Sequence, residues 1–159
     1  MSESRPPRNQ PVAALVVRRV IRATPERLFD AWTDPGQLAQ WWGPQGIVCT
    51  QAEIDLRPGG SYRIANQLPD GSTLWINGVF ESVQRPSQLV FSWQVGGAHA
   101  NIERVTVSFL GVAQGTEVVV THERIGDEKT RDGHELGWQG CLEGLFRFVT
   151  QNGDRHHAE

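Results

Sequence analysis

His122 is the side chain in this sequence whose type and position best suit chemistry. It follows Val118 and Val120 at two-residue spacing, so in a β-strand it shares their apolar face. A histidine there is either a hydrogen-bonded core residue or a group that orients a polar atom of a ligand. Catalysis would also need a base partner. Glu123 is adjacent and points to the opposite face, while His134 lies in a later helical segment at a depth that the sequence does not define.

Motifs for covalent, metal or phosphate chemistry do not occur in the sequence. There is no Ser-His-Asp order, nucleophile elbow, His-Glu-x-x-His pattern or glycine-rich phosphate loop. Cys49 and Cys141 are far apart and lack Cys-x-x-Cys spacing, which indicates two buried or half-buried thiols. We therefore predict no catalytic residue, no metal site and no cofactor.

Composition limits the class of protein. A chain of 159 residues suits one domain, which we expect to span residues 12–151 between polar tails at 1–11 and 152–159. The net charge is -3 and the basic residues are scattered, so we predict no nucleic-acid partner. No apolar run is long enough to cross a membrane, and the amino-terminal residues lack the apolar segment of a secretion signal. These features predict a cytoplasmic protein without membrane contact.

Two short helices are expected directly after a first strand at residues 12–23. Thr24 and Pro25 supply a capping side chain and a proline at the first helical position. Pro35 disfavours helical geometry at the preceding residue and ends this helix. Asp34 then caps a second short helix, which the Gly-Pro pair at 43–44 stops.

Residues 45–125 show alternating apolar residues in runs that turn signals separate. This punctuation predicts six strands joined by hairpins, because no connection is long enough for a crossover helix. The first strand should close the antiparallel sheet beside the last. A long helix follows at about residues 129–151, and its apolar residues fill one sector of the helical wheel.

Four glycines, Gly133, Gly137, Gly140 and Gly144, form one stripe beside that apolar sector. Each glycine costs about 1 kcal/mol relative to alanine inside a helix, so the stripe needs a compensating reason. Either a neighbouring backbone approaches closely, with Gly133 preceding the helix, or the missing side chains leave room for a ligand.

Three segments carry a resemblance to a known family: residues 34–44 with the pair Trp41-Trp42, residues 54–60 with their Pro-Gly-Gly turn, and Gly137-Trp138. Together they resemble the activator-of-heat-shock-protein-90-ATPase-like family of the START-type (SRPBCC) superfamily, over residues 12–151. The resemblance implies an α+β helix-grip fold. In this fold a curved antiparallel sheet of about seven strands wraps around a long C-terminal helix, and two short helices follow the first strand. Thr121-His122 matches a Thr-His pair of the family.

The resemblance also implies a ligand cavity between sheet and helix. Alternation and helical phase place its walls at Phe91, Trp93, Val107, Phe109, Val120, Trp138, Leu142 and Leu145, with Trp41 and Trp42 near one mouth and His122 as the polar group. The alternative for each of these residues is ordinary core packing. Six tryptophans are many for this length, and their rings suit apolar or aromatic ligands.

The leading functional hypothesis is binding of a lipophilic or aromatic small molecule, without a catalytic group. One alternative, which follows from the family, is a co-chaperone module that stimulates a heat-shock-protein-90 ATPase. A second is a cyclase- or hydrolase-like enzyme of the superfamily. The sequence shows no paired titratable residues on the inward face, which argues against an enzyme. An exposed sheet edge and the habit of the family are consistent with a homodimer.

Overall fold

The computed structural model describes residues 13–43, 46–96 and 101–158. The polar tail expected at residues 1–11 lies outside these residues. The described part contains a seven-stranded sheet and three helices, in the element order β1-α1-α2-β2-β3-β4-β5-β6-β7-α3. The predicted α+β helix-grip fold is confirmed.

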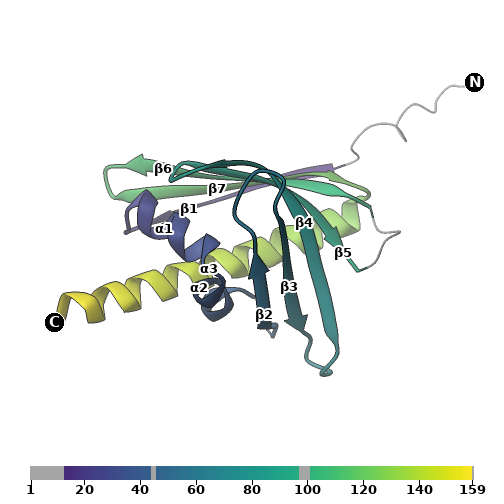
Figure 1. Cartoon of the computed structure of the whole chain (residues 1–159), viewed down its shortest axis with the longest axis horizontal. Coiled ribbons are helices and arrows are strands. Elements are labelled where there is room, and N and C mark those ends of the chain that lie inside the picture. The colour runs from purple at the N-terminus through teal and green to yellow at the C-terminus, as the bar shows by residue number, and fades with distance from the viewer. Residues whose placement is uncertain (1–12, 44–45, 97–100, 159) are drawn as a thin grey trace, which may run out of the picture.

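Every neighbouring pair of strands in the sheet is antiparallel, and the strand order is β1-β7-β6-β5-β4-β3-β2. The first strand therefore closes the sheet beside the last, as the sequence predicts. Figure 1 shows how strongly the sheet curves, because β2, β3 and β4 run steeply across the direction of β1, β6 and β7. The strands are β1 (Ala13–Ile21), β2 (Val48–Ile54), β3 (Ser61–Gln67), β4 (Thr73–Gln84), β5 (Gln88–Val95), β6 (Glu103–Val112) and β7 (Gly115–Ile125).

Alternating side chains build the buried face of this sheet. Along β7, Val118, Val120 and His122 are buried while the residues between them are partly exposed. The register pairs Val120 with Val107 and His122 with Val105 on β6. Paired residues of an antiparallel sheet point to the same face, so the apolar positions of neighbouring strands form one continuous surface.

Capping and proline geometry produce the two short helices, α1 (Pro25–Thr33) and α2 (Pro35–Trp41). The Thr24 hydroxyl accepts a hydrogen bond from the Arg27 N–H at 3.1 Å. The Asp34 carboxylate accepts one from the Gly36 N–H at 3.2 Å. Each cap pairs a backbone donor that the first helical turn leaves free, so both predicted helix starts are confirmed.

The long helix α3 (Glu128–Ala158) lies against the concave side of the sheet and contacts β1, β7, α1 and α2. Its amino-terminal part agrees with the prediction, but its end near residue 151 was predicted wrongly. No proline follows Gln151 in the sequence, so nothing forces the backbone out of helical geometry. Gly133 lies inside this helix rather than before it.

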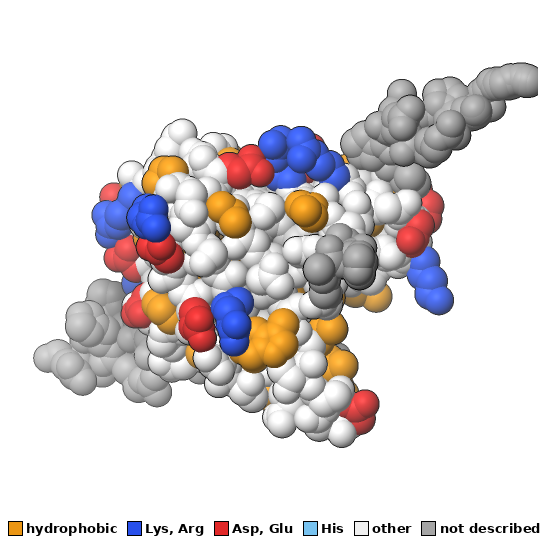
Figure 2. Space-filling model, turned by 45° about the vertical axis from the view of Figure 1, so that its right-hand side comes forward, with side chains coloured by type: hydrophobic (Ala, Val, Ile, Leu, Met, Phe, Trp, Pro, Cys, Tyr) orange, Lys and Arg blue, Asp and Glu red, His pale blue; other side chains and the backbone are white. Residues whose placement is uncertain are grey.

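Ten large apolar side chains are exposed in the part of the chain that the structure describes: Val16, Val20, Val48, Leu56, Leu74, Val79, Ile102, Leu110, Val112 and Leu136. On the face in Figure 2, apolar side chains are separated by charged and polar ones. Both cysteines are free and buried, as expected. None of the helices in the described residues is long and apolar enough to span a membrane.

Candidate functional site

A cavity of about 220 Å³ lies between α3 and the strands β3, β4 and β5, and we call it the outer cavity. Tryptophan rings from three different elements form much of its wall, and two glycines of α3 leave part of the helix surface without side chains. The wall consists of Trp42, Ile47, Asn66, Leu68, Leu74, Ile76, Trp93, Val95, Gly133, His134, Gly137, Trp138 and Cys141.

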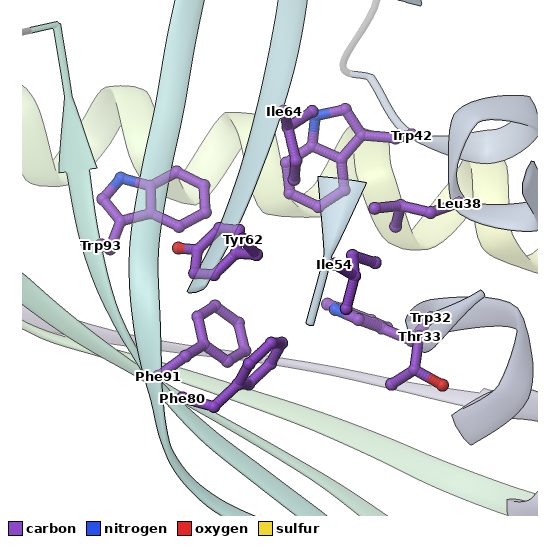
Figure 3. Close-up of a pocket in the computed structure, with 10 residues that line it drawn as sticks. All are labelled: Trp32, Thr33, Leu38, Trp42, Ile54, Tyr62, Ile64, Phe80, Phe91 and Trp93. Atoms are coloured by element: carbon purple, nitrogen blue, oxygen red, sulfur yellow. The ribbon is translucent and has the colours of Figure 1, made fainter. Parts of the chain in front are cut away.

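A second, inner cavity has a volume of only about 20 Å³. Figure 3 shows the aromatic and aliphatic side chains around it, among them Tyr62, Phe80 and Phe91. This space is close to that of one water molecule, so it is too small for an organic ligand. Trp42 and Trp93 line both cavities and form the shared wall.

Some of the predicted wall residues line one of the two cavities, and the others line neither. Trp42, Trp93 and Trp138 line the outer cavity, and Phe91 lines the inner one. Trp41 is buried beside them and donates its Nε1–H to the Ala31 carbonyl at 2.9 Å. The remaining predicted residues are packed in the core and line neither cavity: Val107, Phe109, Val120, His122, Leu142 and Leu145.

The glycine stripe of α3 serves both purposes that the sequence left open. A Cβ atom added to Gly144 would lie 2.4 Å from the carbonyl oxygen of Trp41, so this glycine permits close approach of α2. A Cβ atom added to Gly133 would meet no atom within 4 Å, and Gly133 and Gly137 line the outer cavity. The helix is therefore tightly packed at Gly144 and open at Gly133.

Three tryptophan rings hold one another in place around the outer cavity. The ring centroids of Trp93 and Trp138 are 5.3 Å apart, and those of Trp42 and Trp138 are 5.6 Å apart. Trp42 also donates its Nε1–H to the side-chain oxygen of Asn66 at 2.9 Å. Such contacts fix the ring planes, so the wall is formed before any ligand enters.

A polar network lies behind this aromatic wall. Trp138 donates its Nε1–H to Nδ1 of His122 at 3.0 Å, and His122 Nε2 lies 2.6 Å from Oε1 of Glu103. His134 Nε2 lies 3.1 Å from the same oxygen. Glu103 and the two histidines meet on the inward face, so the prediction that this face lacks paired titratable residues is wrong.

Hydrogen-bond chemistry defines the protonation of this network. An indole N–H can only donate, so Nδ1 of His122 accepts and Nε2 carries the proton that is donated to Glu103. Burial lowers the pKa of His122 below its usual 6.5, which favours this neutral form. Burial alone would raise the pKa of Glu103, but the hydrogen bonds from both histidines outweigh it and hold the pKa at about 2. Glu103 is therefore an ionised, doubly hydrogen-bonded carboxylate.

The same three residues form a donor set of the kind that binds zinc. One ligand atom from each of Glu103, His122 and His134 lies within 4.8 Å of the others. A metal at Nε2 of His122 would require the proton on Nδ1, where it would face the N–H of Trp138. Two donors would then oppose each other without an acceptor. The bond from Trp138 therefore disfavours a metal at this site.

The prediction of site residues from the sequence does not include Glu103 and His134, although simple patterns point to both. Glu103 precedes Val105 by two residues and so belongs to the inward face of β6. It also stands opposite Trp93 in the strand register. His134 precedes Trp138 by four residues, which places both on the same face of α3.

Comparison with known proteins agrees with this fold. Residues 22–150 match the family described as Activator of Hsp90 ATPase homolog 1-like protein. The chain belongs to this family. The resemblance seen in the sequence is thereby confirmed, and the AHSA1-like region contains every residue of the outer cavity and of the Glu103 network. No match is found among curated proteins.

Solved structures of other proteins share the fold over most of this chain. A protein from Chromobacterium violaceum is 26% identical, with a TM-score of 0.77 over 86% of this chain and 96% of its own. The AHSA1-like protein from Aeromonas hydrophila is 26% identical, with a TM-score of 0.72 over 89% and 94%. The AHSA1 protein from Silicibacter pomeroyi is 24% identical, with a TM-score of 0.79 over 88% and 99%, and shows the fold alone.

Proposed function

We propose that this protein binds an apolar, aromatic small molecule in the outer cavity. The observation that carries the proposal is a cavity of about 220 Å³ with walls of Trp42, Trp93 and Trp138. An apolar cavity of about 150 Å³ is large enough to hold benzene, so this one suits a larger aromatic molecule. Such rings provide rigid contact area at low cost in side-chain entropy.

The cavity wall contains groups that fit binding better than covalent chemistry. Cys141 is the thiol of this wall, and burial raises its pKa to about 12, so it stays protonated and unreactive at neutral pH. Asn66 donates its amide hydrogens to the carbonyl oxygens of Ile64 and Leu74, at 3.4 and 3.2 Å. These groups are engaged or inert, so recognition rests on shape, the aromatic rings and few polar atoms.

Calorimetric titration with naphthalene tests the proposal. We expect one molecule of naphthalene to bind per chain. The variant Gly133→Leu should weaken binding, because this exposed glycine lines the cavity and the new side chain would start from open space at its wall. The matched control is Gln139→Leu, which adds the same side chain at an exposed position of α3 outside the cavity wall. No binding by the parent protein, or equal binding by the Gly133 variant, would contradict the proposal.

The family assignment favours a second candidate, stimulation of an Hsp90 ATPase, because the family is described by that activity. An assay of ATP hydrolysis by purified Hsp90, with and without this protein, tests it directly. Naphthalene binding without any change in ATP hydrolysis would support the small-molecule function. Stimulation that survives in Gly133→Leu would instead indicate a function of the protein surface.

A further inference from the structure

His134 is the member of the polar network that reaches the outer cavity. It belongs to the cavity wall, whereas Glu103 and His122 do not. The exposed fraction of its side chain is 19%, against 8% for Glu103 and 0% for His122. The neighbouring wall residue, Gly133, is itself exposed. A molecule that occupies the cavity therefore contacts His134 rather than the two residues behind it.

The hydrogen bond to Glu103 defines the tautomer of the His134 ring. Nε2 of His134 lies 3.1 Å from Oε1 of Glu103. An ionised carboxylate can only accept, so Nε2 carries the proton and donates it to this bond. In the neutral ring this leaves Nδ1 without a proton, as an acceptor. A carboxylate that holds one imidazole nitrogen in this way orients the other nitrogen for a ligand.

Nδ1 of His134 is an accessible atom. In the described part of the chain, the buried side-chain nitrogens without a partner are Trp93 Nε1 and Arg104 Nε. Nδ1 of His134 is not one of them, and within these same residues the ring makes no hydrogen bond other than the one to Glu103. The nitrogen is thus neither buried nor paired there. It provides the outer cavity with a free acceptor.

Two contacts hold the His134 ring in one orientation. Its centroid is 4.5 Å from that of His122 and the two planes are 15° apart, so His122 covers one face. The bond to Glu103 limits rotation of the ring within its plane. The direction of the Nδ1 lone pair is thus set before a ligand arrives, which favours a donor at one defined position.

The groups around His134 select the kind of ligand. Glu103 is ionised, and the hydrogen bond from Trp138 keeps His122 neutral. A second carboxylate close to Glu103 would be repelled. A carbonyl oxygen would direct its lone pairs at that of Nδ1. A hydroxyl group on an aromatic ring avoids both penalties, because it is neutral and donates a proton to the nitrogen.

We propose that the outer cavity binds an aromatic alcohol, of the phenol or naphthol type, whose hydroxyl group donates a hydrogen bond to Nδ1 of His134. This inference rests on the proposed function, because it names the chemical class of the ligand in the same cavity. The aromatic part contacts Trp42 and Trp138. Glu103 acts through His134 as a positioning residue.

Three probes of similar size test the inference. They are 2-naphthol, 2-methylnaphthalene, which has a methyl group in place of the hydroxyl, and the anion 2-naphthoate. Calorimetric titration near neutral pH, where 2-naphthol is un-ionised, gives their affinities. We expect 2-naphthol to bind about five- to tenfold more tightly than 2-methylnaphthalene, the ratio that one net hydrogen bond provides. We expect 2-naphthoate to bind more weakly than 2-naphthol.

Two substitutions of His134 separate the roles of its nitrogens. The side-chain amide of asparagine lies near the position of Nδ1, and that of glutamine lies near the position of Nε2. His134→Asn should therefore keep part of the preference for 2-naphthol over 2-methylnaphthalene, whereas His134→Gln should lose it. If His134 were only a structural residue, both variants would keep the affinity ratio of the parent protein.

Nuclear magnetic resonance of the parent protein, labelled at the histidine nitrogens, supplies a readout that does not depend on the folding of a variant. An unprotonated ring nitrogen resonates far downfield of a protonated one, and accepting a hydrogen bond moves its signal upfield. The Nδ1 signal of His134, assigned by its loss in His134→Gln, should move upfield with 2-naphthol and much less with 2-methylnaphthalene.

The outcomes separate this inference from the function on which it rests. If none of the probes binds, the proposed function itself fails. If 2-naphthol and 2-methylnaphthalene bind equally and the Nδ1 signal responds to both alike, the cavity binds apolar aromatic molecules but the hydroxyl inference is overturned. An unchanged affinity ratio in His134→Gln, or a preference of the parent protein for 2-naphthoate, would overturn it as well.

Discussion

Trp138 donates its indole N–H to Nδ1 of His122 across 3.0 Å, and this bond connects the aromatic wall of the cavity to the Glu103 network. Because the indole occupies Nδ1, the imidazole cannot take a second proton without losing this bond. The ring of His122 is thereby held neutral, in the tautomer that donates to Glu103.

The variant Trp138→Phe should raise the pKa of His122, because it removes the donor that opposes a proton on Nδ1. It should also lower the free energy of unfolding by about 1–3 kcal/mol, the cost of an unpaired buried acceptor. Histidine titration by nuclear magnetic resonance and urea denaturation measure the two effects. Trp75→Phe makes the same chemical change at a partly exposed tryptophan stacked under Arg63, so it should change neither quantity to this extent. An unchanged His122 pKa in Trp138→Phe would contradict the role of the indole.

Cobalt titration tests the conclusion that the hydrogen bond from Trp138 disfavours a metal. We expect the parent protein to develop no visible absorption of tetrahedral cobalt, because His122 keeps its proton on Nε2. Such a band in the parent protein, lost in His134→Ala, would show that the donor set binds metal after all.

Acid should destabilise the protein through Glu103 and His122. The pKa of Glu103 is about 2 in the folded protein and 4.5 when the residue is free of the fold. Its contribution to the free energy of unfolding is therefore complete above pH 4.5 and is lost as the pH falls toward 2. The size of this contribution is on the order of 3 kcal/mol. The pKa of His122 is also lowered, so its contribution is present above pH 6.5 and is lost as the pH falls through the lowered value.

Urea denaturation at a series of pH values measures this dependence. Glu103→Gln keeps a hydrogen-bonding side chain but has no carboxyl proton to gain, so its stability should fall less between pH 4.5 and 2 than that of the parent. Parallel curves for the two proteins would show that Glu103 is not the group responsible.

Two glycines of the same helix should respond oppositely to alanine. Gly133→Ala should stabilise the protein by about 1 kcal/mol, because the new Cβ meets open space and alanine favours the helix. Gly144→Ala should destabilise it by about 1–3 kcal/mol, because the Cβ would lie 2.4 Å from the carbonyl oxygen of Trp41. The melting temperatures of the two variants, measured against the parent protein, check this prediction. If both variants shift the melting temperature equally in one direction, the difference in packing along α3 is contradicted.

The sequence was sufficient to predict the order and pairing of the elements, because alternation, caps and turn residues are local signals. It also predicted that Trp42, Trp93 and Trp138 would face the space between sheet and helix. It did not predict how far along α3 that space extends. Helical phase gives the face on which Leu142 and Leu145 lie, whereas the approach of α2 to Gly144 decides that this part is filled.

The meeting of Glu103 with His134 depends on tertiary geometry in the same way. Alternation places Glu103 on the inward face, and helical phase places His134 beside Trp138. The distance between them is set by the curvature of the sheet and the direction in which α3 crosses it, since 31 residues separate them in the chain. Neither quantity can be derived from the spacing of side chains along one element.

Trp42 and Trp93 form the partition between the two cavities, and the partition consists of side chains rather than backbone. Trp42 is held there by one hydrogen bond to Asn66 and by ring contacts, while Trp93 is held by ring contacts alone among the described residues. The division of this space into two cavities is therefore governed by the torsion angles of two indoles. A related chain with smaller residues at these positions would have one continuous chamber on an unchanged backbone.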